Sequence, residues 1–362
     1  MPEARLHFER PPRVLVVGPS WVGDMVMAQA LFIQIHQDYP GAVIDVLAPA
    51  WSGPVLRCMP QVRQHIPMPV GHGRLGWSER RALGHRLRGQ YDWAILTPNS
   101  LKSALIPWFA QIPVRTGWRG EWRYGLLNDL RVLDKQRYPL MVERFVALAR
   151  RKGAPLPDPL PRPSLEVDKS VQMQALAALD LSPGRPVLAL CPGAEFGRAK
   201  QWPEAHYAKV ASAWIERGGH VWIFGSENDA PVARAIADTA LAGARNLSVS
   251  ERTDACDQPI RVLAGLTSLE QAVALLACAS QVISNDSGLM HVASALNRPL
   301  VVVYGSTSPA FTPPLSDEAE VIQSREPCSP CFERTCRYDH YRCLTQLSPE
   351  RVMQAIRTWP EA

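Results

Sequence analysis

Two short loops constrain the fold of this 362-residue chain more than any other feature. The first, residues 18–24 (GPSWVGD), follows the apolar run Arg13–Val17, and the second, residues 284–291 (SNDSGLMH), follows Gln281–Ile283. Each loop places small residues and a carboxylate where an expected strand gives way to a helix. In open α/β sheets, ligands bind at the carboxyl ends of the strands. The two loops therefore predict two facing domains with a cleft between them.

The rest of the chain alternates short apolar segments with helical ones. The apolar segments are rich in valine, isoleucine and leucine, which is typical of strands buried on both faces of a parallel sheet. We expect strands at Arg13–Gly18, Val43–Ala48, Trp93–Pro98, Pro186–Pro192, His220–Gly225, Gln281–Asn285 and Pro299–Gly305. We expect helices at Val22–Gln37, Trp202–Arg217, Ala230–Leu241 and Ser268–Ala279. This alternation predicts an α/β architecture.

A proline-rich segment predicts the domain boundary. Residues 153–165 contain five prolines at alternate positions, which can continue neither a helix nor a central strand. We therefore expect an interdomain linker there, between domains at residues 1–152 and 166–347. Residues 348–362 are expected to carry a C-terminal helix, with Ser348 as its N-cap and Pro349 at its first position.

Charge is divided unevenly between the two halves. The whole chain has a net charge of +5, but residues 1–152 carry 21 Lys+Arg against 11 Asp+Glu, a net +10. Such a basic half suits nucleic acid, a phosphorylated lipid or a membrane surface, although arginine-rich solvated helices would give the same composition. No apolar stretch approaches the ~20 residues of a membrane span, and the N-terminus does not resemble a signal peptide. We expect a soluble cytoplasmic protein.

Asp24 is the candidate general base in the first half. It lies in the first turn of a helix that Ser20 is expected to cap, where a carboxylate also complements the helix dipole. Its apolar neighbours would shield it, and a shielded carboxylate at a strand end can act as a base. Asp24 stands where a P-loop has lysine, and its charge would repel phosphates, which argues against ATP hydrolysis.

The second half contains candidate groups for a nucleotide. Lys200 lies in a glycine-containing loop that also includes Gly193, which suits a phosphate, although a surface loop often holds a lysine. Glu227 follows a strand, where a carboxylate suits ribose hydroxyls. Residues 286–288 (DSG) open a helix whose free N–H groups favour a diphosphate. His291 lies one turn further on, beside this anion site or simply in the core.

Five segments resemble, in their order along the chain, the ADP-heptose:lipopolysaccharide heptosyltransferases of glycosyltransferase family 9. Each segment alone is unspecific, whereas their joint occurrence is specific. The segments are residues 18–24 (GPSWVGD), 98–104 (PNSLKSA), 115–121 (RTGWRGE), 191–197 (CPGAEFG) and 285–291 (NDSGLMH).

This resemblance implies a GT-B fold, in which two Rossmann-like domains with parallel sheets face a central cleft. The acceptor would bind the N-terminal domain and ADP-heptose the C-terminal one. The resemblance further implies an inverting transfer that needs no metal and no catalytic cofactor. By matching positions, Asp24 would take the proton from the acceptor hydroxyl. Lys200 would bind the diphosphate and offset the charge on departing ADP.

The same matching implies the remaining contacts with the donor. Gly193 lies in the donor loop, Glu227 would bind the ribose and Thr267 would line the adenine pocket. Asp286 would contact the heptose, with the amides of Ser287 and Gly288, and His291, near the phosphates. For an acceptor bearing Kdo carboxylates and lipid A phosphates, the expected basic contacts are Lys102, Arg119, Arg123 and Arg144. A lipid acceptor also implies reversible peripheral contact with the inner membrane.

We therefore expect transfer of L-glycero-D-manno-heptose from ADP-heptose to the first heptose of the inner core, in heptosyl-Kdo2-lipid A. The alternatives are a heptosyltransferase I or III acting on another core acceptor, and a nucleotide-sugar-binding protein without activity. No nucleic-acid partner is expected, because the basic half lacks a recognition motif or a stacking platform.

Four cysteines depart from the roles that this resemblance implies. Cys328, Cys331, Cys336 and Cys343 lie within 16 residues, a spacing that suits zinc or an iron–sulfur cluster. A metal is favoured over disulfides in a cytoplasmic protein, and free thiols remain the other alternative. Because catalysis does not call for this site, we expect a structural clip.

Overall fold

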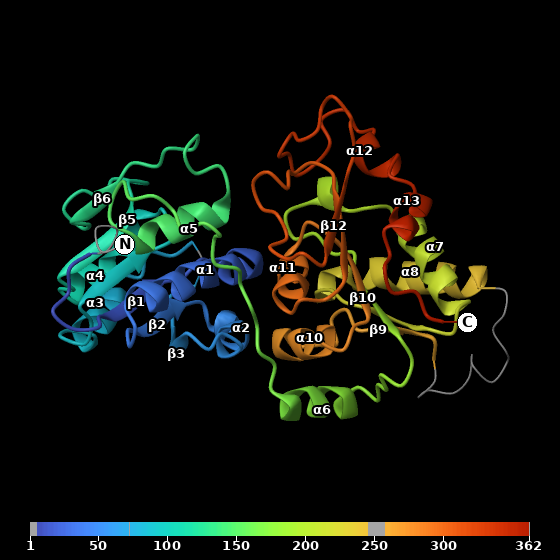
Figure 1. The fold of residues 1–362 in the computed structure, drawn as a ribbon, viewed down its shortest axis with the longest axis horizontal. Coiled ribbons are helices and arrows are strands. Elements are labelled where there is room, and N and C mark those ends of the chain that lie inside the picture. Colours follow the sequence, from blue (N-terminus) through green and yellow to red (C-terminus); the bar gives the residue numbers. More distant parts are fainter. Residues whose placement is uncertain (1–5, 72, 245–257, 362) are drawn as a thin grey trace. The chain divides into compact units, whose positions relative to one another are not determined.

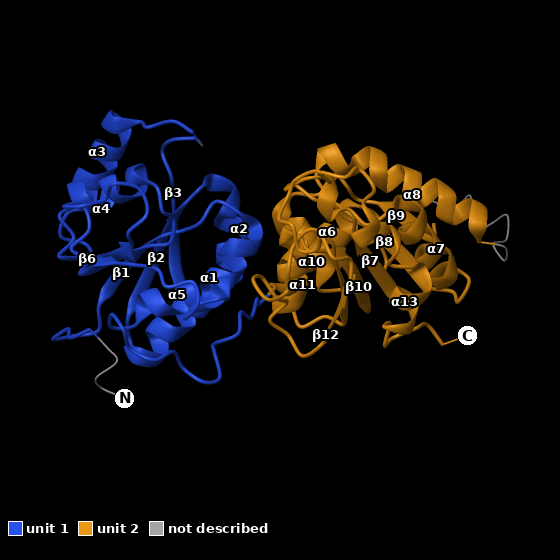
Figure 2. Ribbon diagram, turned by 90° about the horizontal axis from the view of Figure 1, so that it is seen from above, with its two compact units in different colours: residues 1–166 blue, residues 167–362 orange. Residues whose placement is uncertain are grey.

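The computed structural model describes residues 6–71, 73–244 and 258–361. The chain forms two compact units, residues 1–166 and 167–362 (Figures 1 and 2). Each unit contains one six-stranded sheet in which every neighbouring pair of strands is parallel, so the expected α/β architecture is confirmed. None of the helices in these described ranges is long and apolar enough to cross a membrane.

The sheet of unit 1 has the strand order β3-β2-β1-β4-β5-β6. Its strands are β1 (Arg13–Val17), β2 (Val43–Ala48), β3 (Val62–Pro67), β4 (Trp93–Leu96), β5 (Val114–Trp118) and β6 (Asp129–Arg131). Its α-helices are α1 (Val22–Asp38), α2 (Gly53–Arg57), α3 (Trp77–Arg86), α4 (Leu105–Phe109) and α5 (Met141–Ala149). Helices α1 and α5 pack against each other.

The sheet of unit 2 has the order β12-β11-β10-β7-β8-β9. Its strands are β7 (Val187–Cys191), β8 (His220–Ile223), β9 (Ile260–Val262), β10 (Gln281–Asn285), β11 (Leu300–Tyr304) and β12 (Ala319–Gln323). Its α-helices are α6 (Lys169–Ala178), α7 (Glu204–Ile215), α8 (Ala230–Gly243), α10 (Leu269–Leu276), α11 (Gly288–Ala295), α12 (Arg342–Thr345) and α13 (Pro349–Gln354).

Both sheets share one topology. Counted from the first strand of each unit, each has the order 3-2-1-4-5-6, which is the Rossmann order. The chain therefore reverses its direction across the sheet between β1 and β4 in unit 1, and between β7 and β10 in unit 2. Ligands of such sheets bind at this switch point, outside the carboxyl ends of the strands. The loops after these four strands are the places to look for a site.

The expected strands all form, and all but one of the strands that were not expected lie at the edges of the sheets. Val43–Ala48 and Gln281–Asn285 match their expected bounds, and the other five end one or two residues early or start one late. The sequence pattern did not predict β5 or the four edge strands β3, β6, β9 and β12. These segments carry charged or polar residues, so they lack the continuous apolar pattern of central strands.

The expected helix caps have different outcomes. Helix α1 begins at Val22, but its N-cap residue is Trp21 and no side chain caps it, so the expected capping by Ser20 is wrong. The chain is extended at Trp21, which places Ser20 one residue too early to cap. Ser348 is confirmed as the N-cap of α13, where its Oγ accepts a hydrogen bond from the Arg351 N–H at 3.4 Å.

The proline-rich segment contains no helix or strand. Its end is bonded to unit 1 through Gln29, a fully buried residue of α1. The Gln29 amide donates to the Ser164 carbonyl at 2.6 Å, and the Ser164 N–H donates to Gln29 Oε1 at 2.9 Å. The Glu166 N–H donates to the Cys58 carbonyl at 2.9 Å. The last residues before unit 2 therefore follow the surface of unit 1.

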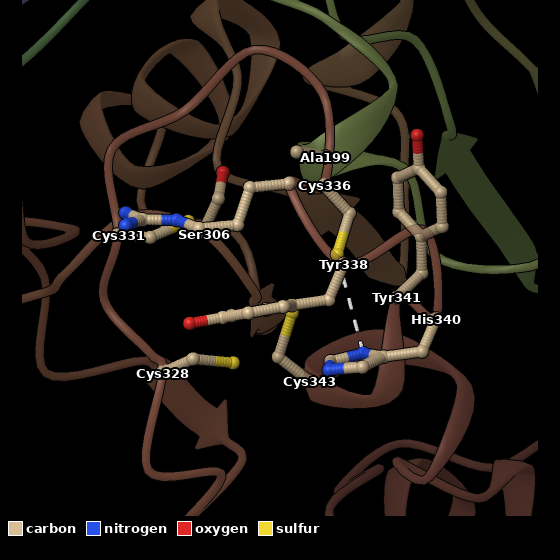
Figure 3. A pocket seen from close by; sticks show the side chains of 10 residues that line it. Ala199, Ser306, Cys328, Cys331, Cys336, Tyr338, His340, Tyr341 and Cys343 are labelled. Carbon is tan, nitrogen blue, oxygen red and sulfur yellow. Dashed lines mark hydrogen bonds between the residues drawn. The ribbon is translucent and has the colours of Figure 1, made fainter.

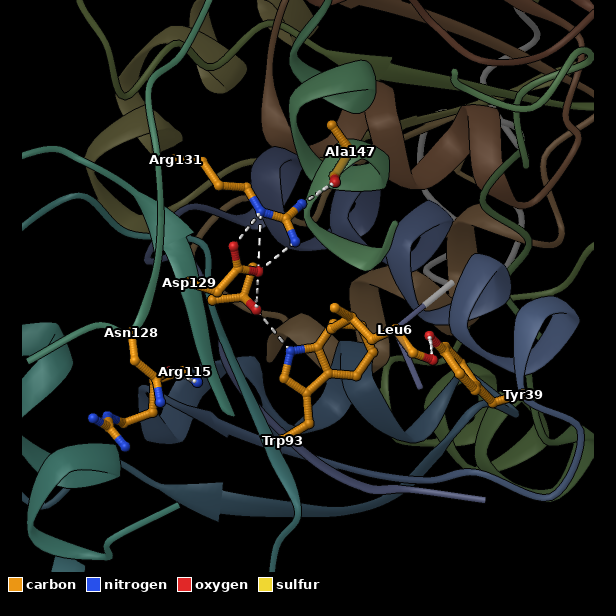
Figure 4. Close-up of polar contacts among 9 residues, drawn as sticks. Leu6, Tyr39, Trp93, Arg115, Asn128, Asp129, Arg131 and Ala147 are labelled. Atoms are coloured by element: carbon orange, nitrogen blue, oxygen red, sulfur yellow. Dashed lines mark hydrogen bonds and ion pairs between the residues drawn. The ribbon is translucent and has the colours of Figure 1, made fainter. Parts of the chain in front are cut away.

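A chain of polar contacts links strands β4, β5 and β6 of the unit 1 sheet to helix α5 (Figure 4). The Trp93 indole N–H donates to Thr116 Oγ1 at 2.8 Å, and Thr116 donates to Asp129 Oδ2 at 2.8 Å. Asp129 forms an ion pair with Arg131, which also donates to the Ala147 carbonyl in α5 at 2.6 Å. Strands β4, β5 and β6 are thereby linked to α5.

Replacing Thr116 with valine tests this chain. The substitution keeps the shape but leaves the buried Trp93 N–H without its acceptor, so we expect a loss of about 1–3 kcal/mol in unfolding free energy. Urea denaturation measures it as a lower midpoint. Thr239→Val makes the same chemical change at an exposed position of α8 and should stay within about 0.5 kcal/mol of wild type. Equal midpoints for the two variants would contradict this role.

Candidate active site

In unit 1, Asp24 lies at the switch point. It occupies the first turn of α1, directly after the loop that follows β1, and its side chain is half-buried. Gly18 lets this loop pack closely, because a Cβ there would lie 2.8 Å from Met25 Cε. The Thr97 N–H, after β4, donates to the Val17 carbonyl at 3.1 Å. The loops after β1 and β4 therefore begin next to each other, joined by this hydrogen bond.

The loops after β4 and β5 are bonded to each other. The Leu101 N–H donates to a Glu121 carboxylate oxygen at 2.9 Å, and the Glu121 N–H donates to the Asn99 carbonyl at 3.0 Å. Gly120 has φ of +49° and touches Asn99 so closely that a Cβ would lie 2.2 Å from its carbonyl oxygen. Lys102, half-buried, follows in the same loop. These bonds fix the backbone around the expected acceptor region.

Arg123 is placed differently from its expected role. Its side chain is fully buried, and its guanidinium donates to the carbonyls of Pro98 (2.7 Å) and Trp118. Burial lowers its pKa to about 10, so the group stays protonated at neutral pH. We therefore assign Arg123 to bracing the two loops rather than to acceptor contact. Arg119 is exposed, and Arg144 is half-buried and donates to the Tyr138 carbonyl at 2.9 Å.

In unit 2, the structure brings Lys200 and Asp286 together at the switch point. Lys200 follows β7 and Asp286 follows β10, yet Lys200 Nζ lies 2.8 Å from Asp286 Oδ2. The Thr307 hydroxyl donates to the same oxygen at 2.6 Å. The two charged side chains are only 15% and 5% exposed. Hydrogen bonds between charged groups are shorter and stronger than neutral ones, so this pair holds the ammonium group in place.

Asn285 is a residue of this site to which the sequence analysis gave no role. It is fully buried, and its Oδ1 accepts from the Trp202 N–H and from the Tyr207 hydroxyl, each at 3.0 Å. Its amide donates to the Pro192 carbonyl at 2.6 Å. Asn285 thus joins both ends of the loop that carries Lys200, residues 192–202 (the Lys200 loop), to β10. Its position inside the matched segment 285–291 was the available signal.

The helix after β10 has the expected N-terminus. Ser287 is the N-cap of α11, and its Oγ accepts from the Met290 N–H at 3.3 Å. Gly288 is the first helical residue. The backbone N–H groups at this end point out of the helix without intrahelical partners, which favours an anion.

His291 lies in the first turn of α11 but is buried, with 5% of its surface exposed. Burial lowers its pKa to about 4, while Asp286 acts in the opposite direction and Lys200 adds to the lowering. The imidazole is therefore neutral at pH 7. It can donate or accept a hydrogen bond near a phosphate, but it does not supply positive charge.

The loops after β8 and β9 bring two further expected residues into one region. The Gly265 N–H donates to the Gly225 carbonyl at 3.1 Å, and a Cβ on Gly265 would lie 3.1 Å from Glu227 Cα. Glu227 is exposed, and Thr267 is half-buried two residues after Gly265. Gly193 packs against the helix start that follows Glu227, where a Cβ would lie 2.6 Å from Asp229 Oδ2.

The four-cysteine segment, residues 328–343, lies against the Lys200 loop. All four thiols line one cavity of about 20 Å³ (Figure 3), and all four are free. Burial raises the pKa of Cys343 to about 11, and the other three thiols add to this effect. Within the described ranges, no three Cys, His, Asp or Glu side chains are already arranged to hold a metal ion.

The two Rossmann-type units give the chain the fold of a GT-B glycosyltransferase. The chain belongs to glycosyltransferase family 9 (heptosyltransferase), whose model matches residues 80–342. It is 49% identical to "Lipopolysaccharide heptosyltransferase 2" of Escherichia coli K12, over 95% of this chain and 97% of the relative. It is 48% identical to "Lipooligosaccharide heptosyltransferase 2" of Haemophilus influenzae, over 86% and 88% of the two chains.

Solved structures agree with this assignment. The structure of E. coli ADP-heptose lps heptosyltransferase II superposes with a TM-score of 0.81 at 47% identity, covering 95% of this chain and 97% of that chain. E. coli heptosyltransferase WaaC with ADP has a TM-score of 0.66 at 22% identity, over 94% and 98% of the two chains, and shares the fold. The fold class and the family inferred from the sequence are confirmed.

The neutral state of His291 predicts a pH dependence of stability. Below its unfolded pKa of about 6.5 the unfolded chain binds a proton, whereas the folded chain does so only near pH 4. The unfolding free energy therefore keeps its full contribution from neutral His291 above pH 6.5. This contribution, about 3 kcal/mol, is lost as the pH falls from about 6.5 to about 4. Urea denaturation at pH 7 and pH 4.5 should show a smaller loss for His291→Gln than for wild type. His7→Gln, at an exposed histidine, should lose as much as wild type.

Proposed function

We propose that this enzyme transfers L-glycero-D-manno-heptose from ADP-heptose to the first heptose of the lipopolysaccharide inner core. The observation that carries the proposal is 49% identity over nearly the full length of a relative named lipopolysaccharide heptosyltransferase 2. The two switch-point sites supply the chemistry that the reaction needs. Transfer forms a bond between the acceptor oxygen and the sugar's anomeric carbon, and breaks the bond from that carbon to ADP.

Asp24 acts as the general base in this proposal. The acceptor hydroxyl must lose a proton as it attacks, and a half-buried carboxylate at the carboxyl end of β1 can accept it. Attack on the face opposite to ADP inverts the anomeric configuration. The transition state resembles an oxocarbenium ion, as in other glycosyl transfers, and inversion requires that the base and the leaving group act on opposite faces of the sugar.

Lys200 stabilises the departing ADP. Negative charge develops on the diphosphate as the bond breaks, and a pre-positioned ammonium group stabilises that charge most where water is excluded. The N-terminal N–H groups at Ser287 and Gly288 add to this field. These groups supply positive charge from the chain itself, which is the basis for a metal-independent transfer. In this proposal Asp286, which is bonded to both Lys200 and Thr307, contacts the heptose.

The remaining donor contacts follow from the loops of unit 2. Glu227 is exposed after β8, where its carboxylate can accept hydrogen bonds from ribose hydroxyls. Thr267, before α10, would line the adenine pocket. Gly193 lets the loop after β7 pass close to Asp229. His291 contributes a neutral hydrogen bond near the phosphates.

An anionic lipid acceptor fits unit 1. The expected contacts with its carboxylates and phosphates are Lys102, Arg119 and Arg144, which lie on or after strands β4 and β5 or on α5. Unit 1 also exposes large aromatic side chains, namely Trp21, Trp51, Trp77, Trp108, Trp122 and Tyr124. Tryptophan and basic residues together favour the interface of an anionic bilayer. We therefore place the enzyme in the cytoplasm, in reversible contact with the inner membrane.

Two alternatives keep the donor site and change the rest. A heptosyltransferase I or III would use the same groups of unit 2 with another core acceptor. A nucleotide-sugar-binding protein without activity would need no base, so the carboxylate at Asp24 argues against it.

Replacing Asp24 with asparagine tests the base. We expect acceptor-dependent release of ADP from ADP-heptose to fall by about 10²–10⁴-fold, because the amide cannot take the proton. ADP release is measured with heptosyl-Kdo2-lipid A present and absent, and ADP affinity is measured by calorimetry. Affinity should not change. Asp238→Asn, at an exposed position of α8, is the matched control and should keep full activity.

The outcomes separate the alternatives. Release only with Kdo2-lipid A would move the enzyme to the heptosyltransferase I step. Tight ADP binding without release on either acceptor would favour another acceptor or a binding protein. Full activity of Asp24→Asn would eliminate Asp24 as the base.

Replacing Lys200 with methionine tests leaving-group stabilisation. We expect kcat to fall by about 10²–10³-fold, because the alkyl side chain keeps the packing without the charge. Steady-state ADP release measures kcat, and circular dichroism checks the fold. The control is Lys209→Met on α7, whose lysine is exposed and pairs with Glu350 at the surface. If both variants retained wild-type kcat, the positive charge of Lys200 would have no part in the transfer.

A further inference from the structure

Within the part of the chain that the structure describes, the four-cysteine segment is a cluster of nucleophilic side chains that the proposed transfer does not use. From Ser324 to Tyr341 the chain forms no helix or strand, and Cys343 lies in the short helix α12. Cys328, Cys331 and Cys336 nevertheless line the same cavity as Cys343 (Figure 3). An irregular segment of this length lacks the hydrogen bonds that order a helix or a sheet. Four thiols around one cavity suggest that a bound metal ion orders it instead.

The cavity has room for a single ion. Its volume of about 20 Å³ is enough for one water-sized sphere. Four thiolates in a tetrahedral arrangement are typical of zinc, or of a single iron. His340 also lines the cavity, with Nδ1 4.0 Å from Cys336 Sγ, and could replace one thiolate.

The thiols must turn toward one another to bind. Zinc lies about 2.3 Å from each sulfur, so tetrahedral ligands stand about 3.8 Å apart. Within the described ranges no ligand set is already closed to this degree. Rotation about the Cα–Cβ bonds shortens the distances, since all four side chains already face one cavity. Cys328, Cys331 and Cys336 lie in the irregular segment, outside any helix or strand.

The segment is bonded to the loop that carries Lys200. The Ala199 N–H, next to Lys200, donates to the Arg334 carbonyl at 3.1 Å. Gly197 has φ of +148° and leaves room for that carbonyl, because a Cβ would lie 2.4 Å from its oxygen. The Arg334 guanidinium lies over the Phe196 ring, 5.4 Å from its centroid. Lys200 Nζ lies 5.0 Å from the centroid of the same ring.

A second set of bonds reaches the partner of Lys200. The Ser329 hydroxyl donates to the Gly305 carbonyl at 2.7 Å, and the Phe332 N–H donates to the Ser306 carbonyl at 2.7 Å. These residues follow β11, and the next one, Thr307, donates to Asp286. The cysteine segment is thus hydrogen-bonded to the residues next to Lys200 and next to Thr307, the partner of Asp286.

We propose that Cys328, Cys331, Cys336 and Cys343 bind a single tetrahedral metal ion, zinc or mononuclear iron, which orders their segment and thereby holds the Lys200 loop. The ion is structural and takes no part in the transfer. Only its coupling to donor binding rests on the proposed function, whereas the metal site itself stands apart from it.

The first experiment measures metal directly. Protein purified without added metal is analysed for zinc and iron by mass spectrometry, and the ion found distinguishes the two. We expect about one ion per chain, lost in the double variant Cys328→Ser/Cys331→Ser. Cys278→Ser, at a half-buried cysteine outside the segment, is the matched control and should keep the ion. Addition of Co²⁺ to metal-free wild type should give the visible absorption of tetrahedral cobalt thiolate.

Any of three results would overturn the site. Wild type that holds no zinc or iron, and gives no cobalt–thiolate absorption, does not have it. A double variant that retains one ion per chain shows that the ion is bound elsewhere. Because the wild-type readouts need no substitution, a variant that fails to fold leaves the test intact. A wild-type chain with four disulfide-bonded rather than free cysteines, by thiol titration, would also contradict the proposal.

The second experiment measures the coupling. ADP affinity is compared by calorimetry for metal-loaded, metal-stripped and zinc-restored wild type. We expect stripping to weaken ADP binding by about tenfold and zinc to restore it. Equal affinity in all three states would show that the metal does not hold the Lys200 loop. That result would leave the transferase unaffected, since activity with Asp24→Asn and Lys200→Met is measured separately.

Discussion

The arrangement of both sites depends on one constraint, the reversal of strand order in a parallel sheet. The carboxyl ends of all the strands lie at the same edge of the sheet. The first and fourth strands are neighbours, so the loops that follow them begin side by side there and then lead to opposite faces. In unit 2 this geometry brings Lys200 and Asp286 within 2.8 Å, although they are 86 positions apart in sequence. In unit 1 it places Asp24 and the Lys102 loop after β1 and β4. The two units use one architecture to hold groups of opposite charge.

In the proposed donor site, the Lys200–Asp286 pair orders both charged groups before a ligand binds. Both side chains are nearly buried, so each charge would be costly alone. Pairing with Asp286, supported by Thr307, keeps the ammonium group in position for a diphosphate. His291 is neutral in the same surroundings because burial lowers its pKa to about 4. The positive charge of this region therefore comes from the Lys200 ammonium group and the N-terminus of α11, whereas the His291 imidazole is uncharged.

The sequence predicted what depends on local pattern and missed what depends on tertiary position. Central strands such as Gln281–Asn285 are apolar throughout, so their bounds could be predicted. Edge strands such as β6 (DLR) carry charges and could not. The residues of the Lys200 loop were found from glycines, charge and family resemblance. The role of Asn285 was missed, since its three hydrogen bonds go to Pro192, Trp202 and Tyr207, which only the fold brings near.

Arg123 shows why charge alone does not identify a contact. The sequence gives it the same appearance as Arg119, a basic residue in the same matched region. In the structure it is fully buried and donates to carbonyl, amide and hydroxyl oxygens of Pro98, Asn99 and Ser103, all of them neutral. With a pKa of about 10, it keeps its positive charge at neutral pH. These oxygens and the nearby Glu121 carboxylate stabilise the buried charge, so Arg123 fixes the two loops rather than meeting a ligand directly.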